Sequence, residues 1–408
     1  MTSRLERLTA EMRAELVRGI LPYWMTSAVD ERRGGFIGAI TEAEERQPDA
    51  PKGGILAARI LWTFAAAYRV LGDARYRDMA RVAFEQLRAR FLDAEHGGLH
   101  WMLHADGAVA DDRKHVYAQA FAIYGLAEYA RATGDLDARH EAIALFRLVE
   151  LKARDLHHGG YVEAFARDWT PLDDVRLGET DPDYPKSTNT HLHVLEAYAN
   201  LYRAWQHPSV RDSLAALLHV FLDHLIDPAT GHLVGFFEAD WRPCTSAVSF
   251  GHDIEASWLM MDAAELVEDV ALRGRVRAAG LRMAAAVLER AYDRVAGGIF
   301  YTRDADGQVD TDKEWWPQAE AIVGFVNAYH ATRRDAFLDA AWGTWEFTRR
   351  HLVDAAHGEW FRRASREGVR RPGFEKVGPW KCPYHNGRAC LELIERAAAP
   401  SLPTRRPA

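Results

Sequence analysis

Two kinds of hydrophobic segment alternate along the chain. Residues 54–73, 117–135 and 318–332 are apolar almost all round and rich in alanine and aromatic residues. Residues 76–92 and 336–352 are more charged and carry one apolar stripe. The first pattern predicts helices packed on several sides, and the second predicts surface helices with one buried face. The chain therefore alternates inner and outer helices.

A short turn pattern recurs with the same period. It consists of an aspartate, a glycine four residues later and then an apolar residue, and its six glycines are Gly34, Gly97, Gly159, Gly231, Gly297 and Gly358, spaced by 61 to 72 residues. A glycine with positive φ suits a helix end, and the aspartate can bond the local backbone. Six copies of an inner and an outer helix predict an all-α fold, an (α/α)6 barrel with short β-hairpins in the connecting loops.

An open helical solenoid is the alternative to a closed barrel. A solenoid needs polar capping repeats, whereas the last repeat ends in the apolar segment CLELIE. Although 408 residues would suggest two or three domains, the repeats predict one catalytic domain over residues 1–400. Residues 401–408 are expected to form a flexible tail, and the first five residues, MTSRL, to be frayed.

Composition narrows the class of partner and compartment. The chain has 51 Lys and Arg against 59 Asp and Glu, a net charge of −8, which argues against nucleic acid or an anionic membrane as partner. We find no apolar run near the ~18 residues that span a bilayer and no signal-peptide pattern. Three cysteines indicate a reducing compartment. We expect a cytoplasmic monomer or weak homodimer.

The phase of the repeat predicts where a site lies. All inner helices of such a barrel run in one direction, so their N-terminal ends gather at one mouth. Polar and aromatic residues that a plain structural helix does not need stand at that phase: Arg59, Tyr117, Gln119, Asn189, His193, His252, Glu255, Trp315, Trp316, Glu320, Trp380 and His385. A concave mouth lined in this way is typical of a small-molecule site.

Histidines are the strongest acid/base candidates among these residues. His252 and Glu255 are three apart on one helix, so the carboxylate is expected to orient the imidazole and raise its basicity. A metal pair or a plain buried hydrogen bond has the same spacing. His191 and His193 are two apart and cannot both face the lumen, so one is structural. Asn189 and His193 share a face.

Other candidates have a structural and a functional interpretation. Arg59, in an alanine-rich helix, either pairs with a glutamate or holds substrate oxygens, and we favour the second. His385 taken alone would be interpreted as a core or loop histidine, and only its position in the repeat makes it a catalytic candidate. The three mouth tryptophans suit sugar faces or simple packing. Glu255 and Glu320 would be the acting pair if the barrel were a glycoside hydrolase.

Four segments carry a resemblance to a known family. In order along the chain they are KSTNTHLHVLEAY, SFGHDIEASWL, WWPQAEA and KVGPWKCPYHNGRAC. They closely resemble the cellobiose 2-epimerases, a family within the N-acylglucosamine 2-epimerase superfamily, from about Gly34 to Glu395. The family fold is an (α/α)6 barrel, in agreement with the repeat count. Thr188 departs from the family pattern, which has Met at this approach to the pocket.

The resemblance implies roles for individual residues. His252 and His385 would be acid/base groups on opposite faces of the substrate, with Glu255 supporting His252. Arg59 and His193 would contact sugar oxygens near the reacting carbons. The remaining substrate-binding residues would be Tyr117, Asn189, Trp315, Trp316, Trp380 and Glu320.

The implied activity is a sugar 2-epimerisation without metal or nicotinamide cofactor. Proton abstraction at C2 through an enediolate would interconvert glucose- and mannose-configured reducing ends, converting cellobiose to glucosyl-mannose and lactose to epilactose. A mannose 2-epimerase or a mannose isomerase acting on monosaccharides is the nearest alternative. A glycoside hydrolase is more distant, and a non-catalytic sugar-binding barrel leaves the paired histidines unexplained.

Overall fold

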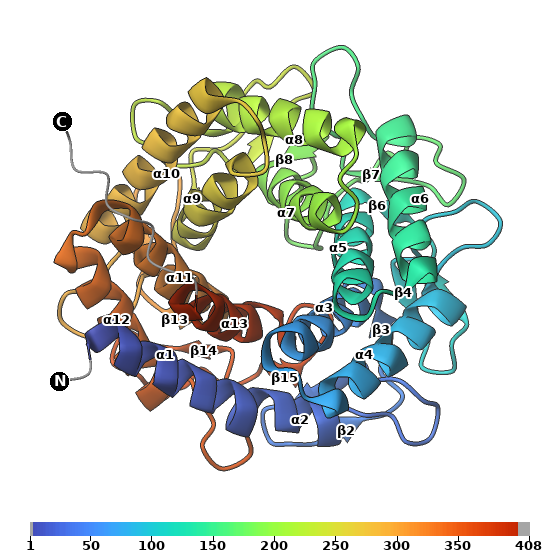
Figure 1. Ribbon diagram of the computed structural model, residues 1–408, viewed down its shortest axis with the longest axis horizontal. Helices are drawn as coiled ribbons and strands as arrows, with labels where there is room; N and C mark the ends of the chain where they lie inside the picture. Colours follow the sequence, from blue (N-terminus) through green and yellow to red (C-terminus); the bar gives the residue numbers. More distant parts are fainter. Residues whose placement is uncertain (1–2, 399–408) are drawn as a thin grey trace.

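Every second helix of the chain belongs to an inner ring. The computed structural model describes residues 3–398. The inner helices are α3 (Gly54–Leu71), α5 (Val116–Thr133), α7 (Thr188–Ala204), α9 (Phe250–Ala264), α11 (Trp315–Thr332) and α13 (Tyr384–Ala398). Figure 1 looks down this ring. Because α13 packs against both α11 and α3, the ring is closed.

An outer ring covers the inner one (Figure 1). Its helices are α1 (Arg4–Glu15), α2 (Leu21–Thr26), α4 (Ala74–Gln86), α6 (Leu136–Lys152), α8 (Pro208–Val220), α10 (Val270–Arg290) and α12 (Asp335–His351). A π-helical turn, Leu16–Ile20, joins α1 to α2 into one outer element, and similar turns, Leu87–Phe91 and Phe221–Leu225, extend α4 and α8. The architecture is the predicted (α/α)6 barrel.

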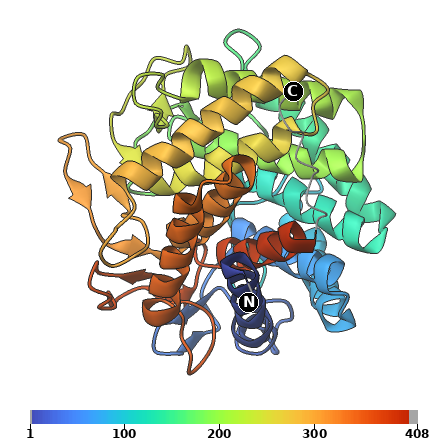
Figure 2. The ribbon, with the colours of Figure 1, turned by 60° about the vertical axis from the view of Figure 1, so that its left-hand side comes forward.

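Short strands link neighbouring repeats at the mouth where the inner helices begin. They are β1 (Ala39–Thr41), β2 (Arg46–Gln47), β3 (Lys52–Gly53), β4 (Met102–Leu103), β5 (Val109–Asp111), β6 (Lys114–His115), β7 (Ala164–Phe165), β8 (Lys186–Ser187), β9 (Phe236–Phe237), β10 (Val248–Ser249), β11 (Thr302–Arg303), β12 (Val309–Asp310), β13 (Lys313–Glu314), β14 (Arg363–Ala364) and β15 (Glu375–Val377). Each strand that leads into an inner helix pairs antiparallel with the loop after the next outer helix. The last pair, β15 with β1, closes this chain of sheets. In Figure 2 the orange β11–β12 hairpin projects beyond the helices.

The repeated aspartate turns have the predicted geometry. All six glycines have positive φ, between 70° and 90°. In the second copy, one oxygen of Asp93 accepts from the backbone N–H of Glu95 and of His96. The other oxygen accepts from Lys114 at 2.9 Å, a partner that sequence reasoning did not identify. The turn is therefore tied to β6, the strand that leads into α5.

The same aspartate–lysine pair recurs in four other repeats. These pairs are Lys52–Asp30, Lys186–Asp155, Lys313–Asp293 and Lys376–Asp354. The fourth repeat has Val248 at the lysine position, and there Thr230 donates to Asp227 instead. Since the lysines are buried, each pair holds the start of an inner helix against the preceding turn, which fixes the position of the mouth residues.

Two expectations about the chain ends and apolar runs need correction. Ser3 caps α1 and forms a reciprocal capping box with Glu6, so the described part of MTSRL is not frayed. The tail expected at 401–408 lies outside the described residues. One helix, α3, is apolar and long enough by length and composition to cross a membrane. In the structure, 78% of the residues of α3 are buried inside the protein. An apolar composition is what a helix packed on all sides in a barrel core requires.

Candidate active site

A cavity of about 290 Å³ lies at the mouth where the inner helices begin. We call it the histidine cavity. All of the predicted mouth residues except Gln119 and Glu320 line it, namely Arg59, Tyr117, Asn189, His193, His252, Glu255, Trp315, Trp316, Trp380 and His385. The structure thus brings together residues that lie more than 300 positions apart in the sequence, because they share one phase of the repeat.

His385, in the first turn of α13, is held from behind by a carboxylate. Its Nδ1 lies 2.7 Å from Oε1 of Glu320, which is 1% exposed and does not line the cavity. Glu320 was expected to bind substrate, and the structure places its carboxylate against His385 and outside the cavity lining. A proton on Nδ1 directed at the carboxylate leaves Nε2 of His385 as the basic nitrogen for the cavity. Burial lowers the pKa of His385 well below its ordinary value.

His252 reaches the cavity from the start of α9. Its ring lies 4.8 Å from the ring of Trp316, which in turn lies 5.5 Å from the ring of His385. Within residues 3–398 no side chain hydrogen-bonds the His252 ring. Desolvation lowers the pKa of His252 to about 3. Both imidazoles are therefore neutral at neutral pH, and both contact one indole.

Glu255 does not support His252 as expected. Its Oε1 accepts from Nη2 of Arg388 at 2.6 Å and lies 3.8 Å from Nδ1 of His385. Its Oε2 is buried with no hydrogen-bond partner among the described residues. Burial and the neighbouring charge of Glu320 raise the pKa of Glu255 well above its usual range. Glu255 therefore does not orient His252, because it turns toward the His385 side, and the carboxylate that acts to raise the pKa of His252 is Glu320.

Arg388 connects the carboxylates beneath the cavity. This fully buried guanidinium, one turn after His385 on α13, donates to Glu255 and Glu320 at 2.6 Å each and to Glu196. One positive charge faces three carboxylates, and burial also raises the pKa of Glu320. A proton shared by the Glu255–Glu320 pair leaves two carboxylate charges against this one cation. Sequence reasoning missed Arg388, although a buried arginine one turn from a candidate histidine was a usable signal.

His193 on α7 has the same kind of support as His385. Its Nδ1 lies 3.0 Å from Oε2 of Glu196, which also accepts from the Tyr384 hydroxyl at 2.5 Å. Burial alone would raise the pKa of Glu196, but Arg388 and His193 lower it to about 2. Burial lowers the pKa of His193 to about 4. His193 thus presents Nε2 to the cavity from a fixed orientation.

Arg59 is a buried cation that pairs with no carboxylate among the described residues. It donates to the Tyr117 hydroxyl at 2.7 Å and to Cys382 Sγ at 3.9 Å. Its guanidinium carbon lies 4.1 Å from the ring centroid of Phe121, a cation–π distance. Its Nε has no partner in the described part of the chain. Of the two interpretations, pairing with a glutamate is excluded, and a free donor beside the cavity is left.

Several polar residues near the mouth are structural. His191 accepts from the Tyr161 N–H at 2.9 Å and contacts the Ser187 carbonyl at 2.7 Å, so of the two neighbouring histidines it is the structural one. Gln119 bonds both backbone groups of Leu99. Thr188, expected at the pocket approach, is buried and donates to the Val234 carbonyl instead. These side chains hold the loop after each turn to the start of an inner helix.

Other residues of the cavity wall were not predicted. Glu314, at the end of β13, lines the cavity, and burial raises its pKa to about 7. The loop between β7 and β8 contributes residues 177, 178, 180 and 181. Sequence reasoning gave this loop no role, because it has neither helical nor strand periodicity.

A second cavity of about 590 Å³ adjoins the first, and we call it the outer cavity. The two share Leu177, Gly178, Thr180 and Trp380. Trp101 lines only the outer cavity, and its ring lies 6.1 Å from that of Trp380. The site is thus longer than one sugar ring.

The carboxylates suit neither a metal nor a glycosidase. Glu255, Glu320 and His385 offer ligand atoms within 4.8 Å of one another. However, Arg388 donates to both carboxylates, so its guanidinium takes the place that a metal cation would need. Retaining glycosidases hold their carboxyl groups ~5 Å apart on either side of a sugar. Here both are buried on one side of His385, which excludes them as that pair.

Comparison with known proteins identifies the family to which the chain belongs. The family model described as N-acylglucosamine 2-epimerase (GlcNAc 2-epimerase) matches residues 35–389. A cellobiose 2-epimerase of Bacteroides fragilis is 44% identical over 95% of this chain and 99% of its own. The structure of the cellobiose 2-epimerase from Bacillus thermoamylovorans superposes with a TM-score of 0.91 at 37% identity, covering 96% of this chain and 99% of that one. A D-mannose isomerase of Marinomonas mediterranea is 25% identical over 84% of this chain and 86% of its own.

Proposed function

Because the chain belongs to the N-acylglucosamine 2-epimerase family, we propose that this carbohydrate epimerase inverts C2 at the reducing end of cellobiose to give glucosyl-mannose. One observation carries the proposal. His252 and His385 are two neutral imidazoles that contact the same indole, Trp316, in a cavity that also contains Arg59, a cation with no carboxylate partner in residues 3–398. Two bases and one cation are what C2 inversion through an enediolate requires.

The reaction begins with opening of the hemiacetal ring. A histidine transfers the proton from the C1 hydroxyl to the ring oxygen, and the C1 carbonyl that forms acidifies the C2 proton. One of His252 and His385 then removes this proton, and the electron pair moves onto the carbonyl oxygen as an enediolate. Arg59 stabilises that negative charge in a site of low dielectric constant, and Nε2 of His193 accepts a hydrogen bond from a sugar hydroxyl.

Inversion needs a second proton donor. Rotation about the C2–C3 bond presents the other face of the enediolate. The second histidine takes up a proton from solvent and delivers it to C2 there, and the first histidine then releases the abstracted proton to solvent. The depressed pKa values of His252 and His385 mean that either can start as the base. Glu320 stabilises His385 when it is positively charged, in the manner of the carboxylate of a hydrolytic triad. A proton delivered to C1 instead would give the ketose, which we expect as a slow side reaction.

Cavity length favours a disaccharide substrate. The reducing sugar occupies the histidine cavity, and the second sugar extends past Trp380 into the outer cavity toward Trp101. Flat indole faces suit the apolar faces of sugar rings. Lactose shares the reducing-end glucose and should give epilactose. The enzyme is further proposed to act in the cytoplasm as a monomer or weak homodimer, without a cofactor.

A substrate panel tests the proposal. The protein is incubated with cellobiose, lactose, glucose and mannose, and products are resolved by chromatography. Conversion of cellobiose to glucosyl-mannose at a kcat/KM well above that for free glucose or mannose is expected. Preferential use of mannose would favour the monosaccharide epimerase or isomerase, and fructose as the main product would favour the isomerase. Free glucose from cellobiose would indicate hydrolysis and contradict the proposal.

A further inference from the structure

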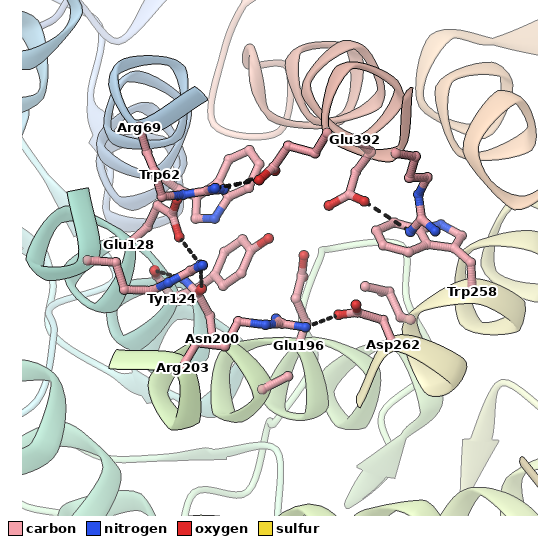
Figure 3. Close-up of a pocket in the computed structure, with 15 residues that line it drawn as sticks. Trp62, Arg69, Tyr124, Glu128, Glu196, Asn200, Arg203, Trp258, Asp262 and Glu392 are labelled. Atoms are coloured by element: carbon pink, nitrogen blue, oxygen red, sulfur yellow. Dashed lines mark hydrogen bonds and ion pairs between the residues drawn. The ribbon is translucent and has the colours of Figure 1, made fainter. Parts of the chain in front are cut away.

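A cavity of about 390 Å³ lies at the opposite mouth of the barrel, where the inner helices end. We call it the far-mouth cavity, and Figure 3 looks into it. Its walls come from the C-terminal halves of α3, α5, α7, α9 and α13. None of its lining residues lines the histidine cavity. It takes no part in the mechanism derived above.

Polar side chains of this mouth, most of them charged, bridge neighbouring helices around the whole ring. The six bridges are Arg69–Glu128, Arg131–Asn200, Arg203–Asp262, Asn327–Met261, Arg396–Asn327 and Arg69–Glu395. Arginines in a last helical turn also compensate the negative end of the helix dipole. These groups are thus occupied in closing the barrel, and they leave the middle of the cavity to other side chains.

Three polar groups that face the middle of the cavity can each form a further hydrogen bond. Trp62 is 4% exposed, and its Nε1 has no hydrogen-bond partner among residues 3–398. Its indole stacks on Tyr124, with ring centroids 5.0 Å apart and planes 10° apart. Figure 3 shows the Tyr124 hydroxyl and the Glu392 carboxylate directed into the same space, and one Glu392 oxygen also pairs with Arg396 at 3.0 Å. A buried N–H without an acceptor is rare in folded proteins and indicates a missing partner.

The chemistry of these groups selects the ligand class. Trp62 needs an acceptor, the Glu392 oxygen that does not pair with Arg396 can accept from a further donor, and Tyr124 can serve as either. A hydroxyl group is both donor and acceptor, so a molecule with several hydroxyls satisfies all three. A simple cation offers no acceptor to Trp62 and meets the surrounding arginines. A simple anion meets the carboxylates of Glu392, Glu395 and Asp262, which line the same cavity.

We propose that the far-mouth cavity binds a neutral polyhydroxylated molecule of monosaccharide size, held by Trp62, Tyr124 and Glu392. The volume lies in the ~300–1,000 Å³ range of small-molecule sites. The rim is open to solvent, since the Glu395 and Asp262 side chains are 39% and 36% exposed. Glu196 lines this cavity and also bonds His193, so an occupant lies one side chain away from the histidine cavity.

Indole NMR tests this site without reference to catalysis. The Trp62 Nε1–H signal of protein labelled with ¹⁵N is assigned with the Trp62→Phe variant. The probes are methyl α-glucoside and sorbitol, neither of which has a ring that opens to an aldehyde. Saturable movement of the Trp62 signal, with a dissociation constant in the millimolar range expected of so small a ligand, is predicted for both probes.

The controls decide between occupants. Glu392→Gln should weaken the response at least several-fold while the other indole signals keep their positions, which shows that the fold is intact. Putrescine and succinate serve as cation and anion probes. Movement of Trp62 with either of these but not with the polyols would overturn the proposal. So would a Trp62 signal that stays fixed with every probe, or a Glu392→Gln variant that responds like the parent.

Discussion

Nδ1 of His385 lies 2.7 Å from Oε1 of Glu320, a buried carboxylate that does not line the histidine cavity. The carboxylate fixes the tautomer and orientation of the ring and is placed to stabilise its positive charge when Nε2 takes a proton. Since Arg388 fixes Glu320 in turn at 2.6 Å, the geometry of the base depends on residues beneath the cavity.

Glu320→Gln tests this support. The amide keeps the size of the side chain but not its charge, so protonated His385 loses its stabilisation. We expect kcat to fall by about 10²- to 10⁴-fold, with a smaller change in KM. Steady-state kinetics with cellobiose measures the effect. Glu395→Gln, at a half-exposed glutamate of the opposite mouth, is the matched control and should keep full activity. Equal activity of the two variants would show that Glu320 has no such role.

The two-base assignment predicts the effect of removing each imidazole. His252→Ala and His385→Ala should each lose about 10³-fold or more in kcat, with an unchanged circular dichroism spectrum. His157→Ala, at an exposed turn histidine, is the control for loss of an imidazole as such. If either cavity variant keeps parental activity, the two-base assignment is wrong.

Arg388 carries a prediction about stability. Arg388→Met leaves the carboxylates of Glu196, Glu255 and Glu320 buried without their cation, so we expect a loss of about 3–5 kcal/mol in the free energy of unfolding. Urea denaturation measures it. Adding Glu320→Gln to Arg388→Met should recover part of the loss, because one buried charge is removed. A single variant as stable as the parent would contradict the charge balance described here.

The buried histidines predict a pH dependence of stability. The pKa of His193 is about 4 in the folded protein, against 6.5 for a histidine in a solvated, unfolded chain. Between these values the unfolded chain binds more protons, so the free energy of unfolding falls as pH drops from 6.5 toward 4. His193 alone contributes about 3 kcal/mol over that window. Urea denaturation across this range should show a shallower slope in His193→Gln. A parental slope in that variant would remove His193 as the cause.

Trp101 tests the length of the substrate. It lines the outer cavity but not the histidine cavity. Trp101→Ala should therefore lower kcat/KM for cellobiose about tenfold through loss of ring contact, and leave kcat/KM for free mannose unchanged. Equal losses for both sugars would indicate a general structural role instead.

The barrel fold and the location of the site at one mouth could be predicted from the sequence for a physical reason. The period of the aspartate turns sets both the number of helix pairs and the phase of residues such as Arg59 and His385, so convergence could be deduced without coordinates. Side-chain direction could not. Glu255 is three residues from His252, yet it points toward Arg388, because a buried guanidinium attracts it more strongly than a neutral imidazole.

The lysines opposite the repeated aspartates were visible in the sequence at the strand before five of the inner helices, but their partners lie about 20 to 30 residues upstream. A local pattern search does not connect residues at that distance. The role of the loop between β7 and β8 could not be predicted from the sequence for another reason. It has no periodicity, and only the fold places it over the two cavities.

Exchange of the C2 proton with solvent tests the central claim most directly. The protein is incubated in D2O with cellobiose, without added metal, and C2 of the reducing sugar is followed by NMR. The account predicts deuterium at C2 of glucosyl-mannose formed with inverted configuration, and loss of this exchange in His252→Ala and His385→Ala. Inversion without any deuterium at C2, or no conversion of any reducing sugar by the folded protein, would contradict it.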